Sequence, residues 1–161
     1  MKRLISFATA SVIAVFLVVP AMVSAGNDGR HDSAVGGFRG VGGVNNVDVS
    51  AHSDANGANP YGHLNQTIAP SKGTARSDRF DVTCLEVQGN FAKIGLTASN
   101  ATTAAHFPSG RVLLVVDNGT PVGGQPADTY GYFNGTNDCT LPFTPATNLP
   151  ASGNILVQDQ P

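Results

Sequence analysis

The sequence predicts an exported protein with one all-β domain, an antiparallel sandwich or small barrel of roughly seven or eight short strands. Beyond the N-terminal segment, apolar residues recur in short runs with a period of two, and turn-forming residues separate these runs. The same region contains no long window in which apolar residues follow the helical period of 3.6. We therefore expect very little helix.

The N-terminal segment has the layout of a signal peptide. A short positive region precedes an apolar stretch over 4–19, and Pro20 and a run of small residues ending at Ala25 follow. We predict a signal peptide over 1–25, with cleavage after Ala25. A transmembrane anchor is the alternative, but an anchor needs about 20 apolar residues without interruption, and this stretch is shorter.

The rest of the chain divides into a tail and one domain. Residues 26–34 are poor in core-forming side chains, so we expect a flexible N-terminal tail there. Residues 35–161 are enough for a single β-domain with its own core. No later segment is apolar enough to span a bilayer, so we expect no membrane insertion after signal cleavage. The expected location is secreted or extracellular, with the periplasm and the cell surface included.

Charge is sparse in this chain. Charged residues make up 12% of the sequence, and the net charge is −2 before the signal peptide removes Lys2 and Arg3. A mildly negative protein supplies no field that attracts phosphate backbones or anionic lipid surfaces. This balance argues against nucleic acid as a partner and leaves an extracellular surface partner as the expectation.

The strands are expected where apolar residues alternate or form short continuous runs. In chain order they lie at 35–44 (a Gly-rich edge strand or a loop), 47–51, 64–68, 80–87, 91–98, 112–116, 130–133 and 155–157. The turn signal at 88–90 predicts a hairpin between the fourth and fifth of these, with a bulge near 85–87. The 112–116 run is apolar throughout, which predicts burial on both faces. Three prolines make 142–150 irregular.

The two cysteines, Cys84 and Cys139, both lie in the predicted domain. A small, even number of cysteines in an exported protein most simply forms one disulfide. Such a bond stabilises a fold by about 4 kcal/mol in the chain-entropy model when its geometry is unstrained. Two separate buried thiols are the alternative.

Several motifs occur in a fixed order along the chain. They are Gly62-His63-Leu64-Asn65, the stretch from Val82 to Ala92, the stretch from Val115 to Pro121, Asp128-Thr129-Tyr130 and Asp138-Cys139. Over roughly 35–160 this arrangement resembles a group of uncharacterised secreted bacterial β-domains, some described as following a choice-of-anchor P region. The resemblance implies export and an all-β fold. It carries over no reaction and no catalytic residue.

Calcium is the metal considered from the sequence. Asp117, Asn118, Asp128 and Asp138 cluster in two expected β-connections, and calcium prefers such hard oxygen ligands. The spacing of an EF-hand loop is absent. The competing interpretation is turn chemistry, in which Asp and Asn side chains bind their own backbone. No other cofactor is expected.

Catalytic patterns are weak, and we assign no catalytic residue. The four histidines stand far apart, and Ser109 near His106 resembles a turn rather than part of a triad. Glu86 is the one glutamate, and Asp48, Asp78 and Asp81 are expected as isolated charges on solvated strand faces.

Three functions remain open. A non-catalytic secreted module that serves as an extracellular structural or interaction domain is favoured by the low charge and the missing motifs. A small-ligand barrel would line a cavity with the strands at 91–98, 112–116 and 129–134. An uncharacterised extracellular hydrolase would need scattered Asp and His side chains to converge in a cleft.

Overall fold

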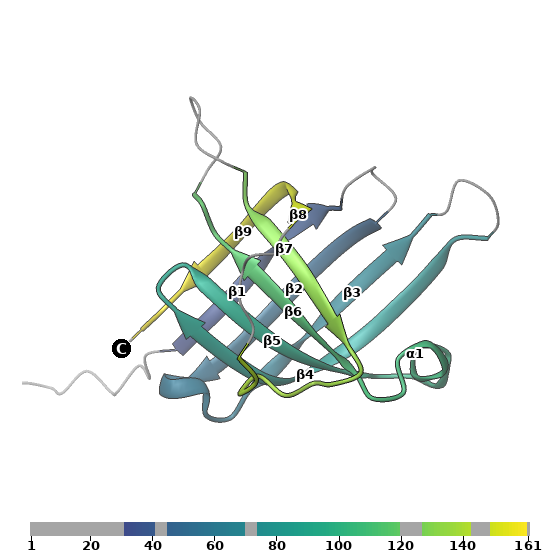
Figure 1. The fold of residues 1–161 in the computed structure, drawn as a ribbon, viewed down its shortest axis with the longest axis horizontal. Coiled ribbons are helices and arrows are strands. Elements are labelled where there is room, and N and C mark those ends of the chain that lie inside the picture. Colours follow the sequence, from purple (N-terminus) through teal and green to yellow (C-terminus); the bar gives the residue numbers. More distant parts are fainter. Residues whose placement is uncertain (1–30, 41–44, 70–73, 120–126, 143–148, 161) are drawn as a thin grey trace, which may run out of the picture.

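The computed structural model describes residues 31–40, 45–69, 74–119, 127–142 and 149–160. Within them the chain forms one antiparallel sheet with the strand order β8-β7-β6-β5-β4-β3-β2-β1-β9, which confirms the all-β prediction (Figure 1). The elements are β1 (His31–Arg39), β2 (Asn45–Asp54), η2 (Ala55–Gly57), β3 (Tyr61–Ile68), β4 (Arg76–Gln88), β5 (Phe91–Ala98), α1 (Ala101–His106), β6 (Arg111–Val116), β7 (Thr129–Asn134), β8 (Leu149–Pro150) and β9 (Ser152–Gln158). Of the two architectures expected, the described residues form a single curled sheet rather than two packed sheets.

Alternating apolar residues explain most of the strands. In β2 the buried and exposed side chains alternate from Val47 to Ser53, as a strand with one face on a core requires. The β4–β5 hairpin turns at Gly89 and Asn90, as predicted. Its register shifts between Val82 and Cys84, a few residues before the predicted bulge.

The last strands roll the sheet up. β8 pairs with β7 and β9 pairs with β1, so these two strands lie at opposite edges of the sheet. Only Ala151 separates β8 from β9 along the chain. Because neighbouring Cα atoms are about 3.8 Å apart, the two edges must come within a few ångströms of each other at Ala151. The sheet in Figure 1 therefore curls round its own concave face.

Two aspartates bind β9 to the opposite edge of the curled sheet. Asp128, which is buried, accepts a hydrogen bond from the Ile155 N–H at 2.8 Å, and Asp117 accepts one from the Val157 N–H at 3.0 Å. The backbone N–H of Ala151 donates to the Asp128 carbonyl at 2.7 Å. We call this junction, where Asp117 and Asp128 contact β9, the seam. Its carboxylates accept hydrogen bonds from β9 N–H groups that a neighbouring strand would otherwise accept, so fewer backbone donors are left unpaired.

The concave face holds the main core. Its buried apolar side chains come from β1 to β7 and β9, and Phe107, directly after α1, packs against them. Leu113 and Val115 of β6 point into this core, and so does Tyr130 of β7. The alternate residues of β6, Val112 and Leu114, are fully buried as well. The 112–116 run is therefore covered on both faces, as its continuous apolar sequence predicts.

A segment of chain covers the outer face beside β4 and β5. Cys84 of β4 and Cys139 form a disulfide with their Cα atoms 6.1 Å apart, which confirms the predicted link. Lys93 of β5 is buried beneath the segment, and its Nζ donates to Glu86 at 2.8 Å and to the Cys139 carbonyl at 3.1 Å. Gly95 lies opposite Cys84 in the register. A Cβ atom at Gly95 would lie 2.2 Å from both the Cys84 sulfur and the Asn137 carbonyl oxygen.

One helical turn interrupts the strands. α1 begins after Asn100, whose side chain accepts a hydrogen bond from the Thr103 N–H at 2.8 Å. The buried hydroxyl of Thr103 accepts from the Arg79 N–H at 3.1 Å and ties the helix to β4. This anchoring positions Phe107, directly after the helix, against the core.

The prediction of a flexible tail over 26–34 is wrong for 31–34, which belong to β1. Asp32 and Ala34 are buried, and the Asp32 carboxylate accepts a hydrogen bond from the Gln160 N–H at 3.1 Å. β1 is also no edge strand, because β9 pairs with its outer side. The partner strand lies more than 100 residues away, so no local pattern could predict this pairing.

The predicted signal peptide over 1–25 and the first part of the predicted tail, 26–30, lie outside the described residues. In the part of the chain that the structure describes, no helix has the length and hydropathy needed to cross a membrane.

The Asp128→Asn variant tests the seam. Both carboxylate oxygens of Asp128 accept backbone N–H bonds, and an amide nitrogen would place a donor against one of those donors. We expect the free energy of unfolding in urea to fall by about 2 kcal/mol. Asp138→Asn is the control: Asp138 is exposed and binds within its own turn, so a change below about 0.5 kcal/mol is expected. Equal losses in both variants would contradict a special role for the seam.

The Gly95→Ala variant tests the packing under the disulfide. The added methyl group would overlap the Cys84 sulfur and a backbone oxygen, so we expect a loss of about 3 kcal/mol or an unfolded protein. In Gly89→Ala the new methyl meets nothing within 4 Å, and only the positive φ of 60° costs free energy, about 1 kcal/mol. Thermal unfolding of both variants measures the difference. A Gly95→Ala protein as stable as Gly89→Ala would disprove the close packing.

Candidate functional site

The structure brings three of the four calcium candidates close together. Asp117 accepts the Gly119 and Val157 N–H groups, and Asp128 accepts the N–H of Asn118 and that of Ile155. Every carboxylate oxygen of these two aspartates thus already accepts a backbone hydrogen bond. The described residues hold no group of three or more His, Cys, Asp or Glu side chains placed for a metal ion.

The fourth calcium candidate, Asp138, has a separate role. Its carboxylate accepts hydrogen bonds from the backbone and the hydroxyl of Thr140, at 2.8 and 2.7 Å. These bonds lower the pKa of Asp138, since they favour its charged form. This is the turn chemistry that the sequence offered as the alternative.

Histidine and serine side chains meet on the convex face. Ser50 Oγ and His52 Nε2 lie 3.1 Å apart, and the His52 ring stacks on Tyr61 with centroids 5.2 Å apart. The register also places Ser50, His63 and Asp81 in one row across β2, β3 and β4. His63 and Asp81 are exposed, and the Ser50 hydroxyl contacts His52 rather than His63. The arrangement differs from the buried, relayed geometry of a catalytic triad.

The other histidines have local contacts. His31 lies 3.3 Å from the Asp54 carboxylate, with both side chains about half exposed. The His106 ring nitrogen Nδ1 contacts the Thr102 carbonyl at 2.9 Å, and Ser109 lies in a turn, as expected.

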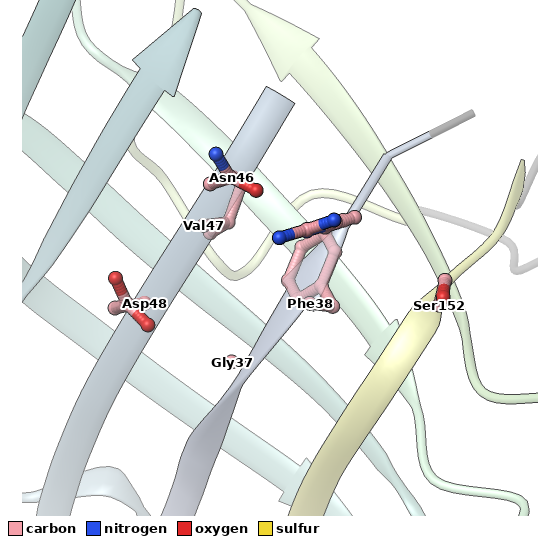
Figure 2. Close-up of a pocket in the computed structure, with 7 residues that line it drawn as sticks. Gly37, Phe38, Asn46, Val47, Asp48 and Ser152 are labelled. Atoms are coloured by element: carbon pink, nitrogen blue, oxygen red, sulfur yellow. The ribbon is translucent and has the colours of Figure 1, made fainter. Parts of the chain in front are cut away.

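An open hollow lies on β1, β2 and the start of β9. Its volume is about 320 Å³, and Figure 2 shows the residues that line it. The lining residues are Gly37, Phe38, Arg39, Asn46, Val47, Asp48 and Ser152. The absence of a side chain at Gly37 leaves room in the hollow, because a Cβ atom there would lie only 2.9 Å from Asp48 Oδ1. The hollow combines a guanidinium, a carboxylate, an amide and a hydroxyl on one surface.

A second set of polar side chains lies inside the curl. We call the residues Gln66, Asp78, Arg111 and Tyr132 the inner polar cluster. Arg111 Nη1 donates to Gln66 Oε1 at 2.8 Å, and Gln66 lies opposite Asp78 in the β3–β4 register. Asp78 Oδ2 accepts from Arg76 Nε at 2.9 Å. Gln66, Asp78 and Arg111 are each at most 5% exposed.

Aromatic rings surround the Arg111 guanidinium. Its central carbon lies 3.5 Å from the centroid of Tyr132, 4.7 Å from that of Phe107 and 5.7 Å from that of Phe80. Guanidinium groups bind favourably to such ring faces. Burial lowers the pKa of Arg111 and raises that of Tyr132, because each charged form loses its hydration.

Three atoms of the inner polar cluster are buried without a hydrogen-bond partner. They are Asp78 Oδ1, Arg111 Nε and the Tyr132 hydroxyl. An unpaired buried polar atom costs about 1–3 kcal/mol, and native proteins leave few of them. The cluster therefore has three buried groups available for further hydrogen bonds. They are an acceptor on Asp78, a donor on Arg111 and the Tyr132 hydroxyl, which can both donate and accept.

Sequence reasoning missed this cluster, and the expectation of Asp78 on a solvated face is wrong. Strand periodicity held the needed signal: Asp78 has the same parity as the buried Phe80, and Arg111 has that of Leu113. The prediction placed Asp78 in solvent because its side chain is charged, although its position in the strand alternation indicates the buried face. Only the curl brings β3 and β4 near β6 and β7.

Comparisons with known proteins found no counterpart. No family model matches the chain, and neither a curated protein nor a solved structure matches it.

Proposed function

We propose that this chain is a secreted, non-catalytic module that binds another extracellular molecule through the outer face of β1, β2 and β9. The observation that carries the proposal is the open hollow of Figure 2, which presents charged and neutral polar groups together on strands held in the sheet by backbone pairing. A preformed site of this kind binds with little ordering cost.

The covalent link supports the extracellular part of the proposal. Disulfides persist in oxidising compartments, and the Cys84–Cys139 bond fits such a location. The signal-like pattern over 1–25 and the resemblance to secreted bacterial β-domains point the same way. The sparse charge of the chain favours a neutral or weakly charged partner.

Opposite charges in the hollow suggest how the partner is held. Arg39 and Asp48 can each form charge-assisted hydrogen bonds, and Asn46 and Ser152 can both donate and accept. A partner surface rich in hydroxyl and amide groups would satisfy all four side chains. The hydrolase alternative receives less support, since neither Ser50 nor His52 lines this hollow.

Export is tested by intact mass. We expect protein collected from outside the cells to lack residues 1–25, and its mass to rise by about 2 Da on reduction of the disulfide. Protein that stays inside the cells, or that gains no mass on reduction, would contradict the extracellular part of the proposal.

The hollow is tested by binding of the labelled protein to the surface of the cells that export it. We expect the Arg39→Ala/Asp48→Ala double variant to bind at least threefold more weakly than the original protein, because both charged contacts are lost. Asp81→Ala is the matched control, an exposed carboxylate removed from β4 outside this hollow. The proposal fails if the double variant and the control bind equally well.

A further inference from the structure

Together with Arg76 beside it, the inner polar cluster carries more positive than negative charge. Arg76 and Arg111 bring two guanidinium groups, and Asp78 brings one carboxylate, which is paired with Arg76. Among the described residues no carboxylate lies within 4 Å of Arg111. The Asp78 carboxylate favours the charged form of Arg111 from a longer distance, but Asp78 also pairs with Arg76. One buried positive charge therefore exceeds the negative charge at this end of the curl, which favours the binding of an anion.

The geometry of the Arg111 guanidinium shows which edge is open. Its Nη1 is engaged by Gln66, and its faces lie against aromatic rings, whereas Nε has no partner. The Nε side of a guanidinium is one of the edges that bind a carboxylate with two parallel hydrogen bonds. The Tyr132 hydroxyl, also without a partner, can donate to the same anion.

Asp78 adds a different requirement. Its Oδ1 has no partner and can only accept a hydrogen bond while the group is ionised. A simple carboxylate has no donor to offer it. A hydroxyl group next to the carboxylate would supply that donor.

We propose that the inner polar cluster binds a small hydroxycarboxylate, with the carboxylate on Arg111 and Tyr132 and the hydroxyl on Asp78. Phe80 and Phe107, whose rings lie 5.3 Å apart, form the apolar side of the site. The site lies on the concave face and is separate from the hollow on the outer face. A test of binding at this site is therefore independent of the test of the proposed function.

One charged residue beside the cluster reaches solvent. The Arg76 side chain is one-third exposed while its partner Asp78 is fully buried, so this ion pair runs from the surface to the cluster. Arg76 also lies over the Phe107 ring, with its central carbon 5.9 Å from the centroid. Arg76 thus adds a second positive charge beside the buried Arg111.

Binding of three matched compounds to the purified, oxidised protein tests the proposal. Lactate carries both groups, propionate lacks the hydroxyl, and lactamide lacks the charge. We expect lactate to bind at least tenfold more tightly than either of the others, and to move the NMR signal of the Arg111 Nε–H group. That signal is identified by its absence in Arg111→Gln. No shift with 50 mM lactate, or binding of propionate or lactamide as tight as that of lactate, overturns the proposal.

Two conservative variants keep the test valid if Arg111→Gln does not fold. Tyr132→Phe removes only the hydroxyl and keeps the ring beneath the guanidinium, so we expect an unchanged or higher melting temperature and at least fivefold weaker lactate binding. Tyr61→Phe, on an exposed tyrosine of the convex face, is the control and should bind lactate like the original protein. Full lactate affinity in Tyr132→Phe overturns the assignment of Tyr132.

Discussion

The fold depends on one short constraint at the C-terminal end of the chain. β8 and β9 pair with opposite edges of the sheet although a single residue, Ala151, separates them. The edges must meet there, so the sheet has to roll up, and the twist of its strands makes this possible. Asp117 and Asp128 complete the junction, because their carboxylates accept N–H groups of β9 that have no strand beside them.

The roll also explains why β4 to β6 need cover on both faces. Their concave side chains form the core, while Lys93, Val112 and Leu114 on the convex side are buried as well. The disulfide keeps the 135–141 segment near this convex surface, and Gly95 leaves the room that the sulfur occupies. A covalent link stabilises such a cover chiefly by restricting the unfolded chain. The convex face of β4 to β6 is thus covered by another part of the chain.

The two faces that remain differ in chemistry. On the convex side of β1 and β2, polar groups around Gly37 are open to water and cost little when they are unpaired. On the concave side, Arg111 and Asp78 are shielded from water, so each unpaired atom is costly. The same residue types therefore have different consequences on the two faces. The partner proposed for the outer hollow is therefore another extracellular molecule, and the ligand proposed for the inner polar cluster is a small anion.

The strand periodicity, the hairpin at 88–90 and the cysteine count predicted the all-β class, the longer strands after β1 and the disulfide. These features arise from neighbouring residues and from a single pair of cysteines. The meeting of distant elements could not be predicted this way. The pairing of β1 with β9, the use of Asp117 and Asp128 at the seam, and the burial of Asp78 beside Arg111 all follow from the curl of the sheet. A local pattern tells which face of a strand a side chain lies on, whereas the three-dimensional closure decides what that face meets.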